Sequence, residues 1–202
     1  AHLRRHVPDL LDRVILDVGS GRGKFLNWIE ELGGIVFGLE PCAEYVALTN
    51  AYNVTQGKGE SMPFTDAIFG FLNIAEVIEH CEDPKKLLSE AHRVLQKGGS
   101  AYISIPNRFG MKDQHYHLWF INWLPRFLVP YLITEKESGA NGRQKLIDMH
   151  YYTYWGAKRL IKEAGFSVID TRMTRIPKCL VPLYLFVMPW TLDAHHFIIS
   201  KL

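Results

Sequence analysis

The feature that most constrains the fold is a strand, glycine loop and helix encoded together by the segment VILDVGSGRGKF, residues 14–25. Its apolar start is typical of a buried strand, which ends at Asp17. Gly19, Gly21 and Gly23 follow and open a segment with apolar residues at helical spacing. Glycine lets a backbone turn tightly and brings its amides close to a ligand. The segment therefore predicts an α/β fold with a ligand-binding loop.

The same alternation of strand and helix continues along the chain. Further strands are expected over 35–39, 54–56, 69–75, 101–105, 166–173 and 195–201, and a helix is expected over 42–52. Asp83-Pro84 is typical of a helix start, with an N-cap acceptor and proline at the first helical position, and Gly98-Gly99 is expected to end that helix. Thr153 is expected to start a later helix. This alternation predicts a largely parallel sheet covered on both faces.

Composition indicates an ordinary globular chain. The 202 residues are 48% hydrophobic and 22% charged, and they suit a single domain over 1–202 with a core large enough to need no metal or disulfide. A net charge of +2 gives no strong electrostatic attraction for nucleic acid, so no nucleic-acid partner is expected. The three cysteines are widely spaced without a CxxC pair, which favours a reducing, cytoplasmic location.

An aromatic-rich segment interrupts the regular pattern. Between Pro106 and Trp155 lie 11 of the 25 aromatic residues, and we expect 106–152 to form a cap insertion over the mouth of the sheet. The apolar stretches 118–133 and 180–190 allow several interpretations. They could meet as a lid that walls a hydrophobic acceptor pocket, form a homodimer contact, or lie peripherally on a membrane, where Trp, Tyr and Arg suit the headgroup boundary.

A second marker of ligand binding is Glu40, which follows the second expected strand 17 positions after Gly23. An acid at this place typically accepts hydrogen bonds from ribose hydroxyls. The glycine spacing is GxGxG rather than the GxGxxG of dinucleotide folds. Asp17 would repel a phosphate but would suit a cationic, amino-acid-like ligand. Both features count against a nicotinamide-dependent dehydrogenase, the rival enzyme class.

With these residues in view, the segment from Val14 to Asn107 resembles the class I S-adenosylmethionine-dependent methyltransferases, in particular the ubiquinone and menaquinone biosynthesis branch. The stretches that carry the resemblance are LDVGSGRG, GLEP, GESMPF at 59–64, EVIEHCEDPKKLLSEAHRVLQKGG at 76–99 and HYYTYWGAKRLIKEAGF at 150–166. The resemblance implies a Rossmann-like, seven-stranded, mostly parallel sheet with helices on both faces and a final antiparallel hairpin.

The resemblance also implies S-adenosyl-L-methionine as the cofactor and assigns its contacts. The methionine part would be held by Asp17, Gly19, Ser20, Gly21 and Gly23. Glu40 would bind the ribose, and Pro41 and Cys42 would border the adenine. The family usually has Asp-Ala where this chain has Lys58 and Gly59, so adenine contacts are expected from Gly59 and Glu60. The turn at Ala75 would face the sulfonium.

Methyl transfer from a sulfonium is an in-line displacement, so the protein mainly aligns the acceptor and, for an oxygen or carbon acid, supplies a general base. His80 and His150 are the candidate catalytic residues. Glu76, Glu79 and His80 form an ExxEH pattern that binds a divalent metal in some related quinone O-methyltransferases, or that simply orders the loop; no metal site is assigned.

The function implied is methyl transfer to a small, hydrophobic or lipid-linked acceptor. Two alternatives stay open at this point. One is a cofactor-binding scaffold without acceptor chemistry, and the other is a methyltransferase that acts on protein or nucleic acid.

Overall fold

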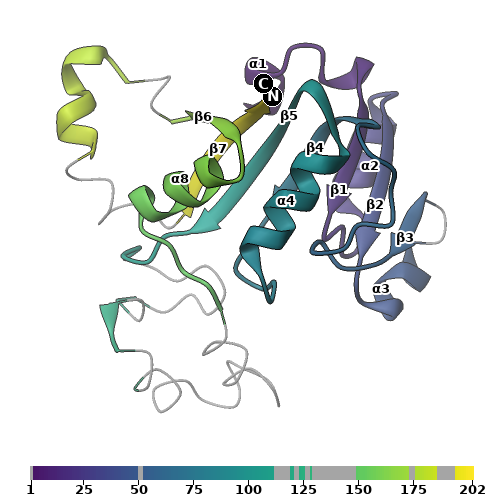
Figure 1. Cartoon of the computed structure of the whole chain (residues 1–202), viewed down its shortest axis with the longest axis horizontal. Coiled ribbons are helices and arrows are strands. Elements are labelled where there is room, and N and C mark those ends of the chain that lie inside the picture. Colours follow the sequence, from purple (N-terminus) through teal and green to yellow (C-terminus); the bar gives the residue numbers. More distant parts are fainter. Residues whose placement is uncertain are drawn as a thin grey trace.

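A seven-stranded sheet runs through the molecule in the order β3-β2-β1-β4-β5-β7-β6 (Figure 1). The computed structural model describes residues 2–49, 52–111, 119–120, 123–125, 128, 149–172, 176–185 and 194–202. The strands are β1 Val14–Val18, β2 Ile35–Glu40, β3 Val54–Gln56, β4 Phe69–Ala75, β5 Leu95–Pro106, β6 Phe166–Asp170 and β7 Ala194–Lys201. Only β7 runs antiparallel to its neighbours β5 and β6, as expected for the final hairpin.

Helices cover both faces of this sheet. They are α1 His2–His6, α2 Lys24–Glu31, α3 Ala43–Leu48, α4 Pro84–Val94 and α8 Tyr154–Glu163, with 3-10 turns η1 Leu10–Asp12 and η4 Lys178–Leu180. The apolar faces of α4 and α8 pack on one side of the sheet, and those of α1 and α2 pack on the other (Figure 1). The observed architecture therefore confirms the expected Rossmann-like α/β fold.

The start of α4 was predicted correctly and its end was not. Asp83 Oδ1 accepts hydrogen bonds from the backbone amides of Lys85 and Lys86, at 3.0 and 3.2 Å. The helix nevertheless ends at Val94, before the expected glycine pair. Leu95 is already extended, with ψ 134°, and pairs with Phe69 of β4. Gly98 and Gly99 instead lie within β5, close to the point where the register between β5 and β4 shifts. The pairing of β5 with β4 outweighs the local preference of these glycines for a helix end.

The carboxyl ends of β1, β2, β4 and β5 lie at one edge of the sheet, as parallel strands require. The pairing of the strands determines which side chains lie on the same face of the sheet at that edge. Asp17 pairs with Asn73, and Asn73 pairs with Tyr102, so these three side chains point to the α2 side. Ligand sites in open α/β sheets lie at this edge.

Most of the expected cap, 106–152, and much of 118–133 and 180–190 lie outside the described residues. The expectation that the two apolar stretches meet therefore stays a prediction, as does the single-domain boundary at 1–202. Within the described ranges, no helix is both long and apolar enough to span a membrane.

Candidate functional site

The glycine loop after β1 is bent back against the ends of β2 and β4. The backbone amides of Gly19 and Ser20 both donate to the Leu39 carbonyl, at 2.7 and 3.1 Å. Gly19 has φ +71°, and a Cβ there would lie 2.7 Å from a Val77 methyl carbon. Gly21, at φ +52°, has open space where a Cβ would project. Gly19 is thus needed for packing, whereas Gly21 leaves room for a ligand.

The Glu40 carboxylate is fixed by the loops on both sides of it. The residue is only 5% exposed. Oε2 accepts a hydrogen bond from the Gly21 amide at 2.8 Å, and Oε1 accepts one from the Cys42 amide at 2.9 Å. Each carboxylate oxygen has a second lone pair, so Glu40 can still accept hydrogen bonds from a ligand. These amides therefore hold a preorganised acceptor for hydroxyl groups.

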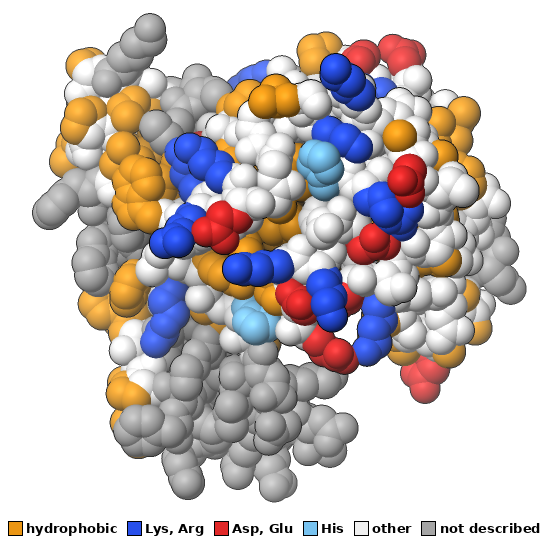
Figure 2. Space-filling view, viewed as in Figure 1, with side chains coloured by type: hydrophobic (Ala, Val, Ile, Leu, Met, Phe, Trp, Pro, Cys, Tyr) orange, Lys and Arg blue, Asp and Glu red, His pale blue; other side chains and the backbone are white. Residues whose placement is uncertain are grey.

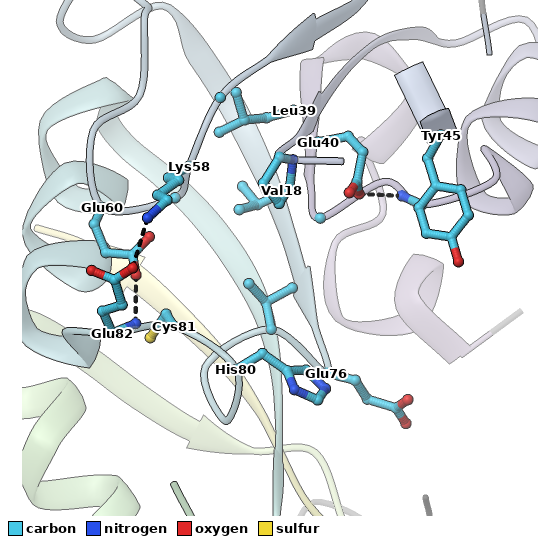
Figure 3. Close-up of a pocket in the computed structure, with 16 residues that line it drawn as sticks. Val18, Leu39, Glu40, Tyr45, Lys58, Glu60, Glu76, His80, Cys81 and Glu82 are labelled. Carbon is cyan, nitrogen blue, oxygen red and sulfur yellow. Dashed lines mark hydrogen bonds and ion pairs between the residues drawn. The ribbon is translucent and has the colours of Figure 1, made fainter. Parts of the chain in front are cut away.

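A first cavity of about 350 Å³ opens beside Glu40 (Figure 3). Figure 3 shows Lys58, Glu60 and Glu82 on one side of it and Glu40 and Tyr45 on the other. Lys58 Nζ and Glu82 Oε1 are 2.7 Å apart, and Glu60 Oε1 accepts from the Glu82 amide at 2.7 Å. The lining residues are Val18, Gly19, Gly21, Leu39, Glu40, Pro41, Tyr45, Gly57, Lys58, Gly59, Glu60, Glu76, Val77, His80, Cys81 and Glu82.

A second cavity of about 390 Å³ lies on the other side of the glycine loop. Gly19, Gly21 and Tyr45 line both cavities. The residues lining the second are Asp17, Gly19, Ser20, Gly21, Arg22, Lys24, Phe25, Tyr45, Asn73 and Ala75. The shared lining residues allow one elongated ligand to extend from Glu60, past Glu40, to Asp17.

Asp17 gives the second cavity a buried acid. Its side chain is 4% exposed, and Oδ1 accepts a hydrogen bond from Asn73 Nδ2 at 2.7 Å. Burial raises the pKa of Asp17 to about 7, the Asn73 hydrogen bond opposes that rise, and the Glu40 charge adds to it. A ligand cation in the second cavity would favour the ionised carboxylate. Asp17 therefore suits an ammonium group and disfavours a phosphate.

The structure brings together most of the predicted site residues, and their roles remain predictions. Those lining the first cavity are Gly19, Gly21, Glu40, Pro41, Gly59, Glu60 and His80, and those lining the second are Asp17, Gly19, Gly21, Ser20 and Ala75. Three predicted residues line neither cavity. A Cβ on Gly23 would contact Thr49 at 3.1 Å, and Cys42 acts through its backbone amide. The His150 amide donates to the Glu79 carbonyl at 2.9 Å.

Sequence reasoning missed several lining residues. Tyr45 lies on the short helix α3 and reaches both cavities, and Val77 and Glu82 follow β4. No local pattern distinguishes these residues from ordinary surface or core positions. Glu76, predicted only as part of the ExxEH pattern and of the turn after β4, has φ +57°, an unusual conformation for a residue other than glycine. Backbone strain of this kind is common at ligand sites.

No three His, Cys, Asp or Glu side chains in the described part of the chain converge as a metal site would require. The ExxEH pattern therefore has no metal-binding geometry among these residues.

Alanine substitutions at Gly21 and Gly33 should separate loop strain from ligand contact. Both glycines have positive φ and open space where a Cβ would project, but Gly33 lies away from both cavities. Each alanine should cost about 1–2 kcal/mol of stability, which corresponds to a melting temperature about 2–8 °C lower. Only Gly21→Ala should also weaken binding of S-adenosylhomocysteine in calorimetry. Equal affinities for the two variants would mean that Gly21 does not border the ligand.

Known proteins share both the sequence pattern and the fold. Residues 16–103 match the model of a methyltransferase domain family. An uncharacterised protein of Methanocaldococcus jannaschii is 36% identical over 106 residues, which are 52% of this chain and 49% of that protein. The demethylmenaquinone methyltransferase of Chlorobaculum parvum is 31% identical over 131 residues, 61% of this chain and 54% of that protein. The chain thus spans about half the length of these curated relatives.

Solved structures share the fold over nearly the whole chain. The crystal structure of an S-adenosylmethionine-dependent methyltransferase from Mesorhizobium loti has a TM-score of 0.67 and 17% identity, covering 98% of this chain and 95% of that one. The family match, from β1 into β5, includes every residue that lines the two cavities. The matched sequence and the paired cavities are therefore the same part of the molecule: residues 16–103 are similar to a methyltransferase domain, and the chain has the fold of the S-adenosylmethionine-dependent methyltransferase from Mesorhizobium loti.

Proposed function

We propose that this chain transfers a methyl group from S-adenosylmethionine to a small apolar acceptor. The observation that carries the proposal is the pair of cavities that share the glycine loop, each with one buried acid. Glu40 would bind the ribose hydroxyls, and the loop at Gly59 and Glu60 would border the adenine. Asp17 would face the amino group of the methionine part. The sulfonium would then lie by Ala75, at the carboxyl end of β4.

The reaction requires little covalent chemistry from the protein. The sulfonium is already activated, and displacement at its methyl carbon needs an aligned nucleophile and the exclusion of water. Alignment of this kind is worth roughly 7–11 kcal/mol of the barrier. With the cofactor held at Glu40 and Asp17, the acceptor would approach over β4 and β5.

Aromatic residues beside the end of β5 support an apolar acceptor. The Phe120 ring lies 6.2 Å from the ring of Trp119 and 6.0 Å from that of Trp123. Trp123 Nε1 donates to the Phe109 carbonyl at 3.0 Å, which ties this group to the segment directly after β5. The three side chains are 44–62% exposed. They offer an apolar surface at the edge where the acceptor would approach.

A small-molecule acceptor also suits the charge distribution. Figure 2 shows basic and acidic side chains interspersed over the face formed by α4 and α8, without one broad basic patch. The relative named demethylmenaquinone methyltransferase supports an acceptor of the demethylmenaquinone type here. The expected membrane and homodimer contacts stay predictions.

The test is methyl transfer from S-adenosylmethionine with a labelled methyl group. The acceptor panel contains a demethylated naphthoquinol, simple phenols and catechols, an amine, a protein mixture and an RNA mixture. We expect turnover with the apolar quinol or phenols, and a lower kcat/KM with Trp123→Ala for these acceptors. Label only in protein or RNA would reject the apolar acceptor, and cofactor binding without any transfer would favour the scaffold alternative.

A further inference from the structure

A row of polar side chains extends from the second cavity across the α2 side of the sheet. Asp17 of β1, Asn73 of β4 and Tyr102 of β5 are successive register partners. One step nearer the carboxyl edge, Ala75, Ser104 of β5 and His196 of β7 are register partners in the same way. Asp17, Asn73 and Ala75 line the second cavity. Ser104 therefore lies next to Ala75, the place expected for the sulfonium, with His196 one strand further along the sheet and Tyr102 one register step away on the same face.

Tyr102 and His196 form a close pair within this row. The phenolic oxygen of Tyr102 and Nδ1 of His196 are 2.6 Å apart, and the two rings are nearly parallel, at 21° with centroids 6.0 Å apart. Both side chains are only partly buried. His196 lies one register step nearer the carboxyl edge of the sheet than Tyr102. Because the two side chains are in hydrogen-bonding contact, the Tyr102 phenol points toward that edge, where the cofactor is expected.

The neighbouring residue His195 lies on the opposite face of the sheet from the Tyr102–His196 pair. His195 points to the α8 side, where it is 2% exposed and packs against Tyr154 and Phe197, with ring centroids 5.5 and 6.2 Å away. Burial lowers the pKa of His195 to about 4, helped by the charge of Arg172, so it stays neutral. His195 belongs to the packing of α8, whereas His196 lies on the face of the second cavity.

We propose that Tyr102 and His196 take the proton from the acceptor, whose nucleophile is a weakly acidic hydroxyl such as that of a phenol or quinol. This inference rests on the proposed function. The acceptor oxygen forms a bond to the methyl carbon while the bond from sulfur to that carbon breaks, and sulfur keeps the electron pair. The acceptor proton passes to the Tyr102 oxygen as the Tyr102 proton passes to His196 Nδ1. The positive charge lost by the sulfonium is then carried by the imidazolium.

Charged groups around the pair suit this transfer. Burial raises the pKa of Tyr102, the Arg172 charge lowers it, and the Glu76 charge raises it again. A raised pKa makes the phenol unsuited to hold a lasting negative charge, so the imidazole serves as the final proton acceptor. The charged and titratable groups that bear on the pair are Glu76 and Arg172, which act on Tyr102, and His195, which interacts with His196. Glu76 also donates its backbone amide to Ser104 Oγ at 3.2 Å, which keeps it beside the row.

The test compares Tyr102→Phe, His196→Gln and the control His92→Gln with the wild-type chain. His92 lies on α4, and its carbonyl accepts from Lys201 at the opposite end of β7. With the naphthoquinol or phenol acceptor, each pair variant should lower kcat about 100- to 10,000-fold, the range for a general base. Calorimetric affinity for S-adenosylhomocysteine should stay within about threefold. The rise of kcat with pH, which reports the imidazole, should disappear in His196→Gln, a change that a merely structural role would not produce.

A second measurement decides the matter without turnover. 4-Nitrocatechol absorbs visible light as the phenolate and much less as the phenol. Added at pH 6 to the chain saturated with S-adenosylhomocysteine, it should show phenolate absorbance with wild type and His92→Gln, and lose it with Tyr102→Phe and His196→Gln.

The two experiments separate this inference from the proposed function. Turnover that persists in both pair variants with an unchanged pH profile would overturn the proton-transfer role and leave the methyl transfer standing. If wild type transfers no methyl group to any acceptor, the proposed function fails and the nitrocatechol spectrum decides alone. Equal spectra for wild type and the two pair variants would then overturn the inference.

Discussion

Asp17→Asn is expected to make the folded chain more stable and its cofactor binding weaker. The folded pKa of Asp17 is about 7, against 3.8 for an ordinary aspartate, because the carboxylate is buried. Below pH 4 the group is protonated in both states. Between pH 4 and 7 the folded state holds the proton while the unfolded state releases it, so stability falls as pH rises. The whole shift corresponds to about 4 kcal/mol, since one pKa unit is about 1.4 kcal/mol.

Asparagine removes this penalty and keeps an oxygen that can accept the Asn73 hydrogen bond, at 2.7 Å in the wild type. At pH 8 the variant should melt at least about 5 °C higher than wild type, and at pH 4 the two should melt together. The exposed Asp12→Asn serves as the control and should show no such pH dependence. A variant that is less stable at pH 8 would mean that the Asp17 charge is compensated in the fold.

Cofactor binding should respond in the opposite direction. An ammonium group in the second cavity binds the ionised carboxylate, so wild-type affinity for S-adenosylhomocysteine should rise with pH up to about 7 and then level off. Asp17→Asn should bind about 10- to 150-fold more weakly at pH 8, the range for a hydrogen bond to a charged group. Its affinity should also be nearly constant between pH 6 and 8. Calorimetry across that range checks both statements.

Glu40→Gln should weaken cofactor binding by a factor similar to that of Asp17→Asn, although it disrupts a different contact. The two oxygens of Glu40 accept from the Gly21 and Cys42 amides, at 2.8 and 2.9 Å. Glutamine has only one oxygen, so its NH₂ group would face one of these N–H donors, and the carboxylate charge would be lost. We expect affinity for S-adenosylhomocysteine to fall about 10- to 150-fold, with a lower melting temperature because a backbone donor loses its acceptor.

A ribose analogue separates the ligand contact from the loop contact. The 2′-deoxy form of S-adenosylhomocysteine should bind wild type more weakly, and Glu40→Gln should discriminate little between the two ligands. Glu44→Gln, at the exposed start of α3, is the matched control and should keep full discrimination. A Glu40→Gln variant that discriminates as strongly as wild type would show that Glu40 only shapes the loop.

Local sequence determined the fold class and the cofactor side of the site. The glycine loop is short, so Gly19 and Gly21 could be predicted from spacing, although hydrogen bonds to Leu39 and Glu40 of β2 hold the loop in place. Glu40 could be found because an acid that directly ends a buried strand must lie at the ligand edge. The N-caps Asp83 and Thr153 were also local, and both accept the expected backbone hydrogen bonds.

Local sequence failed wherever a distant strand changed the outcome. Gly98-Gly99 has the form of a helix end, but Leu95 pairs with Phe69 and becomes strand. His80 and His150 were chosen as catalytic candidates from their positions near motifs, and only His80 lines a cavity. Cys42 was expected to border the adenine, which stays a prediction; its backbone amide donates to Glu40.

The sequence by itself therefore predicted a mostly parallel sheet with a glycine loop and two acids at its carboxyl edge. Only the tertiary structure decided which side chains from distant strands meet near that edge. Tyr102 and His196 are 94 residues apart, and their contact depends on the antiparallel register of β7 against β5. A slip of one residue in that register would turn His195 to the α2 side of the sheet and His196 to the α8 side, because successive side chains of a strand point to opposite faces.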